Sequence, residues 1–373
     1  IRMKSRLFTM THYVFSTTMM TRKCCRERTS MGAQSNKLYI GVDLGGTCVK
    51  IGIVDQTGRI LHKFGYPVNL DDYRTSILTT AIESVRTVFE SNEFKFIVGD
   101  HKIEGIGVSA TGQIDSDTGI VIGAAGHIPG YQGSHIKDRM QEAFHVKVTV
   151  ANDADCSLLG ECGHGAAKGC QNVVMMTLGT GVGGGILVDG HLLKGVRGTA
   201  GEIGHIIIND DGEKCSCGNR GCLEYYASVK ALVHTVKTAT KEGRLELSLF
   251  AVPGGNRSVI YDVDGLNAKV IFDCLRSYKD KTDIKIEELR GIVDSWDNHI
   301  ADGLVSLVHI FNPELILIGG GVSEAGEIFI DPIRSKVLSR VMPSFAQRLR
   351  ISTATLGNDS GIIGAVDYYK TRN

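Results

Sequence analysis

The sequence predicts an α/β protein built from two lobes. Buried strand segments alternate with helical segments along the chain, and several of these strands end in glycine-rich turns. The 373 residues exceed a typical single domain and suffice for two lobes, each with its own hydrophobic core. Hydrophobic residues make up 42% and charged residues 22%, which is typical of a folded chain rather than a disordered one.

The first lobe is predicted over residues 37–151. A strand over residues 38–43 runs into the glycine turn Leu44–Thr47 and returns as a strand over residues 49–54. The pattern then predicts a third strand, a helix near residues 71–89, a strand over 105–109 and a helix over 135–144. Asp43 ends the first strand, where its carboxylate can hold a hydrated Mg²⁺.

The second lobe is predicted over residues 152–358. Its helices are expected over residues 228–241, 265–278 and 286–310, and its strands over 173–176, 315–318 and 350–355. A last helix, over residues 359–371, should return to the first lobe and complete it.

Two glycine-rich turns have the character of phosphate-binding loops. Their backbone N–H groups carry no Cβ obstruction, and each turn adds a threonine hydroxyl, so both can approach phosphate oxygens. A purely structural hairpin has the same pattern. The residues are Gly45, Gly46 and Thr47 in the first turn and Gly179, Thr180 and Gly181 in the second.

A third glycine run, Gly319–Gly321, follows the strand over residues 315–318 and should lead into a helix, where a nucleotide can lie against backbone. None of the three runs has the spacing of a Walker loop or of a dinucleotide-binding fingerprint. The P-loop and Rossmann classes are therefore excluded.

Asp153 lies where the strand over residues 148–151 meets a helix that continues through Glu161. A carboxylate there can accept a proton from a substrate hydroxyl that attacks a phosphate, and Asn152 can orient the same ligand. An aspartate that only caps the helix has the same local sequence. Asp155 is expected to be a solvated or capping acid.

His205, Cys215, Cys217 and Cys222 supply one imidazole and three thiolates at short range, which is a ligand set for structural zinc. Gly218 and Gly221 let the backbone turn tightly between the thiolates. The alternative is three buried free cysteines near an unrelated histidine. Four protein ligands leave no open position on the metal, so this site should hold a loop rather than do chemistry.

Glu202 and Glu224 flank the metal ligands, so a zinc site would fix both carboxylates. Pinned carboxylates suit a ligand rich in hydroxyl groups, because charge-assisted hydrogen bonds are stronger than neutral ones. Taken singly, either residue could be an ordinary surface acid.

The charge balance excludes a global field for nucleic acid or anionic lipid, because 41 basic side chains face 41 acidic ones. No apolar run approaches the ~20 residues of a membrane span. Ten cysteines suit a reducing compartment.

Residues 1–36 are basic and lack periodicity, so they are expected to be a disordered leader, a targeting segment or translated upstream sequence.

Together these motifs resemble those of the ROK family (repressors, open reading frames and kinases) within the actin–hexokinase–Hsp70 superfamily. The resemblance covers residues 37–371. The motifs are Asp43-Leu-Gly-Gly-Thr47, Asn152-Asp153, Gly179-Thr-Gly181, Ala200-Gly-Glu202-Ile-Gly-His205 and Cys215-x-Cys217-Gly-x-x-Gly-Cys222-x-Glu224.

The resemblance implies a two-lobed, actin-like ATPase (ribonuclease H-like) fold with a central cleft and a structural zinc loop. It implies Asp153 as general base, with ATP, Mg²⁺ and structural Zn²⁺ as cofactors. Sugar contacts would come from Thr111, Gly112, Asn152, Asp153, Glu202, His205 and Glu224. Nucleotide contacts would come from Asp43, Gly45, Gly46, Thr47, Lys50, Gly179, Thr180 and Gly181, with Gly320 and Gly321 nearer the adenosine.

The implied activity is ATP-dependent phosphorylation of a hexose to its 6-phosphate by a cytoplasmic homodimer or higher homo-oligomer. Glucose is the first expectation, followed by N-acetylmannosamine or another hexose. Residues 125–131 resemble a glucokinase-like Ile-Pro-Gly-Trp segment, with Tyr131 in place of Trp and His127 where Asn is common. The family also contains sugar-responsive repressors, but residues 1–36 lack the apolar periodicity of a helix-turn-helix. A chaperone or filament protein would have no use for the zinc ligands.

Overall fold

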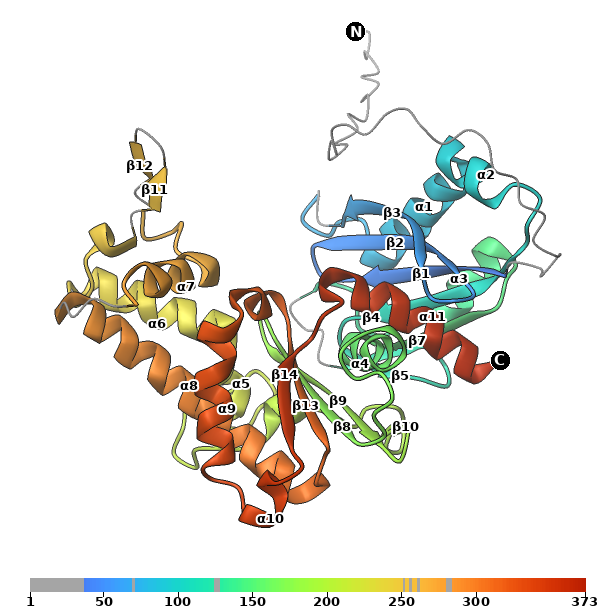
Figure 1. Ribbon diagram of the computed structural model, residues 1–373. Coiled ribbons are helices and arrows are strands. Elements are labelled where there is room, and N and C mark those ends of the chain that lie inside the picture. The colour runs from blue at the N-terminus through green and yellow to red at the C-terminus, as the bar shows by residue number, and fades with distance from the viewer. Residues whose placement is uncertain are drawn as a thin grey trace, which may run out of the picture. The chain divides into compact units, whose positions relative to one another are not determined.

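The computed structural model describes residues 37–68, 71–123, 128–250, 252–254, 257–259, 262–279 and 284–373 (Figure 1). The expected leader, residues 1–36, lies outside this part of the chain. The described residues form an α/β fold with two five-stranded mixed sheets. None of the described helices is both long and apolar enough to cross a membrane.

The first sheet has the strand order β3-β2-β1-β4-β7. Its strands are β1 (Leu38–Leu44), β2 (Cys48–Asp55), β3 (Ile60–Pro67), β4 (Ile103–Ala110) and β7 (Val148–Asn152). β1, β4 and β7 run parallel, and their last residues Leu44, Ala110 and Asn152 lie in register. The residues that follow these three strands therefore meet at one edge of the sheet.

Helices and a small hairpin accompany the first sheet. They are α1 (Ile77–Glu90), α2 (Asn92–Val98) and α3 (Ile136–Phe144), with the hairpin of β5 (Gln113–Asp115) and β6 (Ile120–Gly123). The apolar side chains of these elements form one core with the strands, which includes Ile51, Val85, Val108, Tyr131 and Met140.

The second sheet has the strand order β10-β9-β8-β13-β14. Its strands are β8 (Val173–Leu178), β9 (Val182–Val188), β10 (His191–Leu192), β13 (Leu315–Gly319) and β14 (Arg350–Thr353), while β11 (Val252–Gly254) and β12 (Arg257–Val259) form a separate hairpin. The α-helices are α5 (Leu223–Ala227), α6 (Val229–Lys241), α7 (Ala268–Ser277), α8 (Ile284–Phe311), α9 (Glu327–Leu338) and α10 (Pro343–Ala346). Short 3₁₀ turns are η1 (Ile203–His205), η2 (Leu247–Phe250), η3 (Gly321–Ala325) and η4 (Gly357–Asp359).

The hydrophobic core around the second sheet includes Trp296 of α8, which is buried. Its indole N–H donates to the carbonyls of Ala227 at 2.9 Å and Ser228 at 3.1 Å. The bond satisfies the indole in the core and ties α8 to the junction of α5 and α6.

Two helices link the sheets. α4 (Asp153–His164) follows β7 of the first sheet and precedes β8 of the second, and α11 (Ser360–Arg372) follows β14 and packs on α4, β1 and β4 (Figure 1). The packing is close enough to require glycine. A Cβ on Gly364 of α11 would lie 1.6 Å from the carbonyl oxygen of Cys156, and one on Gly107 of β4 would lie 2.0 Å from that of Ala365.

Glu161 on α4 adds a polar connection to the segment before α11. Its carboxylate is fully buried and accepts hydrogen bonds from the backbone N–H groups of Thr355 and Leu356 at 2.8 and 2.7 Å. It also accepts from the N–H of Ala166 and the hydroxyl of Thr355. Four donors compensate the burial of this charge.

Most element positions expected from the sequence are confirmed within a few residues, and two are wrong. The helix expected near residues 71–89 begins at Ile77, because Ser76 caps it and accepts from the N–H of Thr79, while Asp71 binds Thr75 in the preceding turn. The helix expected after Gly321 is only the 3₁₀ turn η3, and α9 starts at Glu327.

The expectation that Asp155 is solvated or caps the helix is wrong. The residue is 4% exposed, and its Oδ1 has no hydrogen-bond partner in the described part of the chain. The cap of α4 is Asn152, whose side chain accepts from the N–H groups of Ala154 and Asp155. Burial raises the pKa of Asp155 to about 8, with Asp153 and Glu202 acting in the same direction and Lys194 opposing them.

Replacing Gly364 with Ala should destabilise the protein by at least ~3 kcal/mol, because the new methyl group would meet a backbone carbonyl that cannot move alone. Urea unfolding measures the change. Gly291→Ala in α8 is the matched control, since a Cβ there meets nothing within 4 Å, and it should stabilise by ~0.5–1 kcal/mol. Equal unfolding midpoints for Gly364→Ala and the wild type would refute the close-packing argument.

Asp155→Asn should raise the melting temperature, by several degrees more at pH 8 than at pH 5. The pKa of Asp155 in the folded protein, about 8, lies above the ~3.9 of an unfolded aspartate. At pH values between these two, the folded wild type therefore binds one proton that the unfolded chain does not. Its stability therefore falls as the pH rises through this window, whereas an asparagine has no such penalty. Thermal melts at both pH values measure the difference, and a pH-independent effect would rule out a buried neutral carboxyl group.

Candidate functional site

Asp43 lies near the end of β1, at the edge where the three parallel strands finish. Its Oδ2 is 3.1 Å from the Nζ of Lys50 on β2, and its Oδ1 accepts a hydrogen bond from the hydroxyl of Ser109 at 3.0 Å. A Cβ on Gly361 would lie 2.8 Å from the same Oδ1, so the start of α11 also confines this carboxylate. Asp43 of β1 is thus fixed by residues from two other strands and one helix.

The turn between β1 and β2 is held by backbone and side-chain bonds. The N–H of Gly45 donates to the carbonyl of Cys48 at 3.1 Å, and the hydroxyl of Tyr73 donates to the carbonyl of Gly46 at 2.7 Å. Thr47 is exposed and its carbonyl accepts from Val68. The N–H of Gly46 points to no hydrogen-bond acceptor in the described residues, so it can bind an anion.

The second glycine turn joins β8 to β9, and Glu224 of α5 is bound to it. The Glu224 Oε2 accepts from the N–H of Val182 at 3.0 Å, and a Cβ on Gly181 would lie 2.2 Å from that oxygen. The carbonyl of Gly179 accepts from the N–H of Lys230 in α6 at 3.3 Å. Thr180 at the tip is exposed.

Gly320 brings the third glycine run against the second turn. Its φ is +93°, and a Cβ would lie 2.0 Å from the carbonyl oxygen of Leu178, so glycine is required there on two counts. A Cβ on Gly321 would meet nothing within 4 Å, which leaves its backbone open to approach.

A cavity of about 890 Å³ lies between α5, α6 and α8. Its wall includes Thr180, Glu224, Lys230 and Trp296, but not Asp153 or Gly320. It adjoins the second glycine turn without reaching the edge that carries Asp153.

Asn152 and Asp153 end β7 and start α4. The Asn152 Oδ1 caps the helix by accepting from the N–H groups of Ala154 at 2.9 Å and Asp155 at 3.4 Å, and its Nδ2 donates to the carbonyl of Gly112 at 2.9 Å. The helix cap is therefore Asn152, and the Asp153 Oδ1 accepts a hydrogen bond from the N–H of Ala154 at 2.9 Å.

Asp153 is electrostatically coupled to two other acids of the site. Burial raises the pKa of Asp153 to about 6, and the charges of Asp43 and then Glu202 add to the rise. A carboxylate with this pKa is ionised at neutral pH and is a better proton acceptor than an ordinary aspartate.

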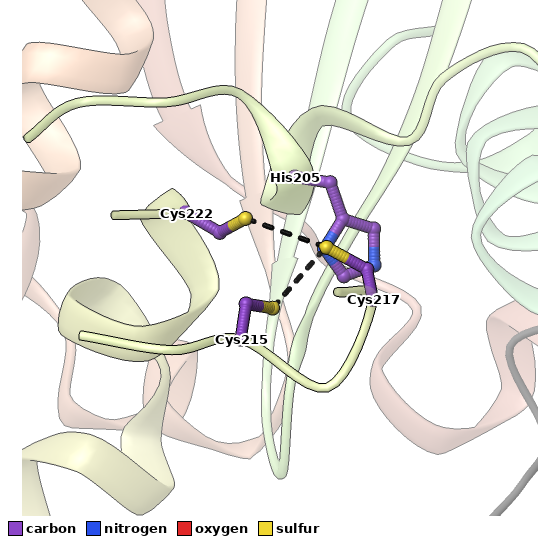
Figure 2. A group of neighbouring side chains, drawn as sticks. All are labelled: His205, Cys215, Cys217 and Cys222. Carbon is purple, nitrogen blue, oxygen red and sulfur yellow. Dashed lines mark hydrogen bonds between the residues drawn. The ribbon is translucent and has the colours of Figure 1, made fainter. Parts of the chain in front are cut away.

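The four predicted zinc ligands gather at one point. Figure 2 shows the thiol groups of Cys215, Cys217 and Cys222 and the imidazole of His205 facing one another, and their ligand atoms all lie within 4.8 Å of one another. The Sγ atoms of Cys217 and Cys222 are 3.6 Å apart, and the Sγ of Cys215 is 3.7 Å from the Nδ1 of His205.

These distances fit a tetrahedral zinc shell, in which thiolates bound at ~2.3 Å lie ~3.8 Å apart. The loop is shaped by glycines. Gly218 and Gly221 have φ of +99° and +69°, and a Cβ on Gly221 would lie 1.7 Å from the carbonyl oxygen of Asn209. The N–H of Asn219 lowers the pKa of the exposed Cys217 thiol, which favours the thiolate that a metal needs.

His205 connects this cluster to the acids. Its Nδ1 faces Cys215, and its Nε2 is 3.9 Å from the Oε2 of Glu202. A metal on Nδ1 would leave the Nε2–H to face Glu202 or a ligand beside it.

The structure thus places the carboxylates of Asp43, Asp153 and Glu202 within electrostatic reach of one another. Thr111 and Gly112 directly follow β4, at the sheet edge where β1 and β7 also end. Residues 125–127 lie outside the described residues, while Ile128–Tyr131 lie within them. Sequence reasoning missed Ser109 and Asn358, which contact Asp43 and Lys50. The register of β1 and β4 places Ser109 opposite Asp43, so the contact could be predicted only if the pairing of these two strands were already known.

The chain is similar to known proteins over most of its length. The ROK family model matches residues 39–372. The glucokinase of Thermotoga maritima is 33% identical over 337 residues, which are 89% of this chain and 97% of that protein. The xylose repressor of Bacillus subtilis is 28% identical over 329 residues, 87% of this chain and 75% of that protein.

The fold also matches a crystal structure of a ROK family glucokinase from Streptomyces griseus in complex with glucose and AMPPNP. The TM-score is 0.72 at 30% identity, over 89% of this chain and 98% of that one. The motifs, the paired sheets and the near-complete coverage of both chains lead to one assignment: this chain belongs to the ROK family.

Proposed function

We propose that this chain is an ATP-dependent hexose kinase that transfers the γ-phosphoryl group to the 6-hydroxyl of glucose. The observation that carries the proposal is Asp153, a carboxylate of raised pKa at the sheet edge where the first glycine turn also lies. Similarity over nearly the full length to a glucokinase supports the same activity.

In the proposed reaction, Asp153 accepts the proton of the attacking sugar hydroxyl. The sugar oxygen forms a bond to the γ-phosphorus, the bond from that phosphorus to the bridging oxygen breaks, and ADP leaves with the electron pair. A Mg²⁺ bound at the Asp43 carboxylate would neutralise part of the negative charge on the phosphates. Lys50 keeps the Asp43 carboxylate oriented, because its ammonium group lies 3.1 Å from it.

The nucleotide would bind across the glycine turns. Its phosphates would meet Gly45, Gly46 and Thr47 of the first turn and Gly179, Thr180 and Gly181 of the second. The N–H groups of Gly45 and Gly179 bond within their own turns, so the N–H of Gly46, which has no acceptor in the described residues, is the donor that the first turn would offer. The adenosine would lie near Gly320 and Gly321, where a Cβ on Gly321 would meet nothing within 4 Å. Glu224 fixes the second turn through Val182, so it has a positioning role there besides any contact with sugar.

The sugar would lie between the end of β4 and the zinc-ligand loop. Asn152 has committed its carbonyl oxygen to the helix cap and one amide hydrogen to Gly112, so its second amide hydrogen is the group it can offer to a sugar hydroxyl. Thr111, Glu202, His205 and the second oxygen of Glu224 would provide the other contacts. N-acetylmannosamine is the second candidate substrate.

Several companion features belong to the same proposal. Structural zinc would be held by His205, Cys215, Cys217 and Cys222. The eight described cysteines are free thiols, which supports a reducing, cytoplasmic location. Assembly into a homodimer or higher homo-oligomer stays a prediction.

A repressor function is the weaker candidate, because the repressor relative is less similar to this chain than the glucokinase is.

The proposed activity is tested with purified protein, Mg·ATP and a panel of hexoses and N-acetylhexosamines. We expect glucose to give the highest kcat/KM. Turnover of N-acetylmannosamine in preference to glucose would change the substrate, and no turnover of any sugar would overturn the proposal.

Asp153→Asn should lower kcat by a few orders of magnitude while the protein still folds and binds sugar, because the amide cannot accept the proton. The wild-type kcat/KM should fall as the pH drops below about 6, where Asp153 becomes protonated. Steady-state kinetics from pH 5 to 8 measure both effects. Turnover near the wild-type value in Asp153→Asn would remove this residue from the role of base.

Protein purified without chelators should contain about one zinc per chain, and Cys217→Ser should lose most of it and melt at a lower temperature. Cys162→Ser, a cysteine outside the cluster, should keep the metal. Elemental analysis and thermal melts provide the readouts. Wild-type protein with no bound zinc would refute the ligand assignment.

A further inference from the structure

The Asp43 carboxylate has one enclosed oxygen and one that a cation can reach. Its Oδ1 accepts a hydrogen bond from the hydroxyl of Ser109 at 3.0 Å, and Ser109 is fully buried. A Cβ on Gly361 would lie 2.8 Å from the same Oδ1 and 3.2 Å from the Oγ of Ser109, so α11 closes this side. The other oxygen, Oδ2, lies 3.1 Å from the Nζ of Lys50. A cation that approaches Asp43 from solvent therefore meets Oδ2, where the ammonium group already lies.

The ion pair of Asp43 and Lys50 is open to solvent. The side chain of Lys50 is 37% exposed and that of Asp43 is 19% exposed. The Nζ of Lys50 also lies 3.5 Å from the Oδ1 of Asn358 in η4. An ammonium group carries three donors on a flexible stem. It can therefore leave Asp43 while another acceptor stays within its reach.

Lys50 lies beside the turn where phosphates would bind. Asp43 and Lys50 pair across the β1–β2 hairpin, and the turn between these strands contains Gly46, whose N–H has no acceptor in the described residues. Phosphate oxygens at this turn would offer the ammonium group a new anionic partner. Two cations beside one carboxylate oxygen repel each other, so a divalent cation and the ammonium group would compete for Oδ2.

We propose that Lys50 exchanges its ionic partner when nucleotide binds. In the free protein its ammonium group covers Oδ2 of Asp43, the oxygen that a hydrated divalent cation would use. When a nucleotide is bound together with its cation, the ammonium group pairs with a phosphate oxygen, and Ser109 keeps the carboxylate in place. The inference rests on the proposed kinase function and adds to it that divalent cations bind Asp43 weakly until phosphates are present.

The test is Lys50→Met, which removes the charge and keeps a side chain of similar length. Without nucleotide, the variant should bind Mn²⁺ about fivefold more tightly than the wild type, because the competitor at Oδ2 is gone. Its dissociation constant for Mg·ADP should rise about tenfold, because a phosphate loses a charged donor. Lys50→Gln, a second neutral variant, should change both constants in the same directions.

Electron paramagnetic resonance of free Mn²⁺ and calorimetry with Mg·ADP measure the two constants. Asp43→Asn identifies the bound Mn²⁺ that belongs to this carboxylate, because that part of the binding should be lost in it.

Lys63→Met is the matched control, because the loss of any positive charge favours cations and disfavours anions to some extent. Lys63 of β3 pairs with Asp359 of η4 at 2.7 Å, and its side chain is 52% exposed. Its replacement removes the same charge from the neighbouring strand and should change either constant by less than about twofold.

An Asp43-dependent Mn²⁺ affinity in Lys50→Met that is no higher than in the wild type or in Lys63→Met would overturn the inference, since Lys50 would then only orient the carboxylate. An unchanged dissociation constant for Mg·ADP would also overturn it. A failure of the proposed function is distinguishable from both results, because it would appear as no turnover of any sugar by the wild type.

Discussion

The contact between α4 and α11 is the constraint on which the arrangement of the site depends. Gly364 and Gly107 allow backbone to approach backbone at distances that no other residue permits. The same helix places Gly361 against Asp43, and α4 begins with Asp153. The two acids of the site are therefore held relative to each other by one glycine-dependent packing, and Glu161 adds three hydrogen bonds to the segment that leads into α11.

Electrostatics in the site follow from this packing. Asp43, Asp153, Asp155 and Glu202 lie within electrostatic reach of one another in partly or fully dehydrated surroundings, where Lys50 pairs with Asp43 and Lys194 acts on Asp155. Excess negative charge in such surroundings favours protonated carboxyl groups and raises the basicity of those that stay ionised. This charge is costly for stability, and it prepares a proton acceptor and a place for cations.

Local patterns in the sequence were sufficient for the glycine turns, the strands, the helix start at Asp153 and the gathering of the thiols with His205. They failed where contacts between segments distant in the sequence determine the burial or the partner of a side chain. Asp155 follows a polar pattern typical of a first helical turn, but the packing of α4 within the fold buries it. The bond from Val182 to Glu224 likewise depends on a contact that periodicity cannot encode. The start of α1 was missed because both Asp71 and Ser76 are capping residues.

Cys222 and Glu224 are separated by a single residue, Leu223, which is fully buried. Cys222 belongs to the thiol cluster, and Glu224 accepts a hydrogen bond from Val182 next to the β8–β9 turn. Because a single buried residue separates the two, a ligand that orders the turn would also restrain the cluster. By reciprocity, a metal bound to the cluster would change the affinity of the turn for a ligand by the same factor by which that ligand changes the affinity of the cluster for the metal.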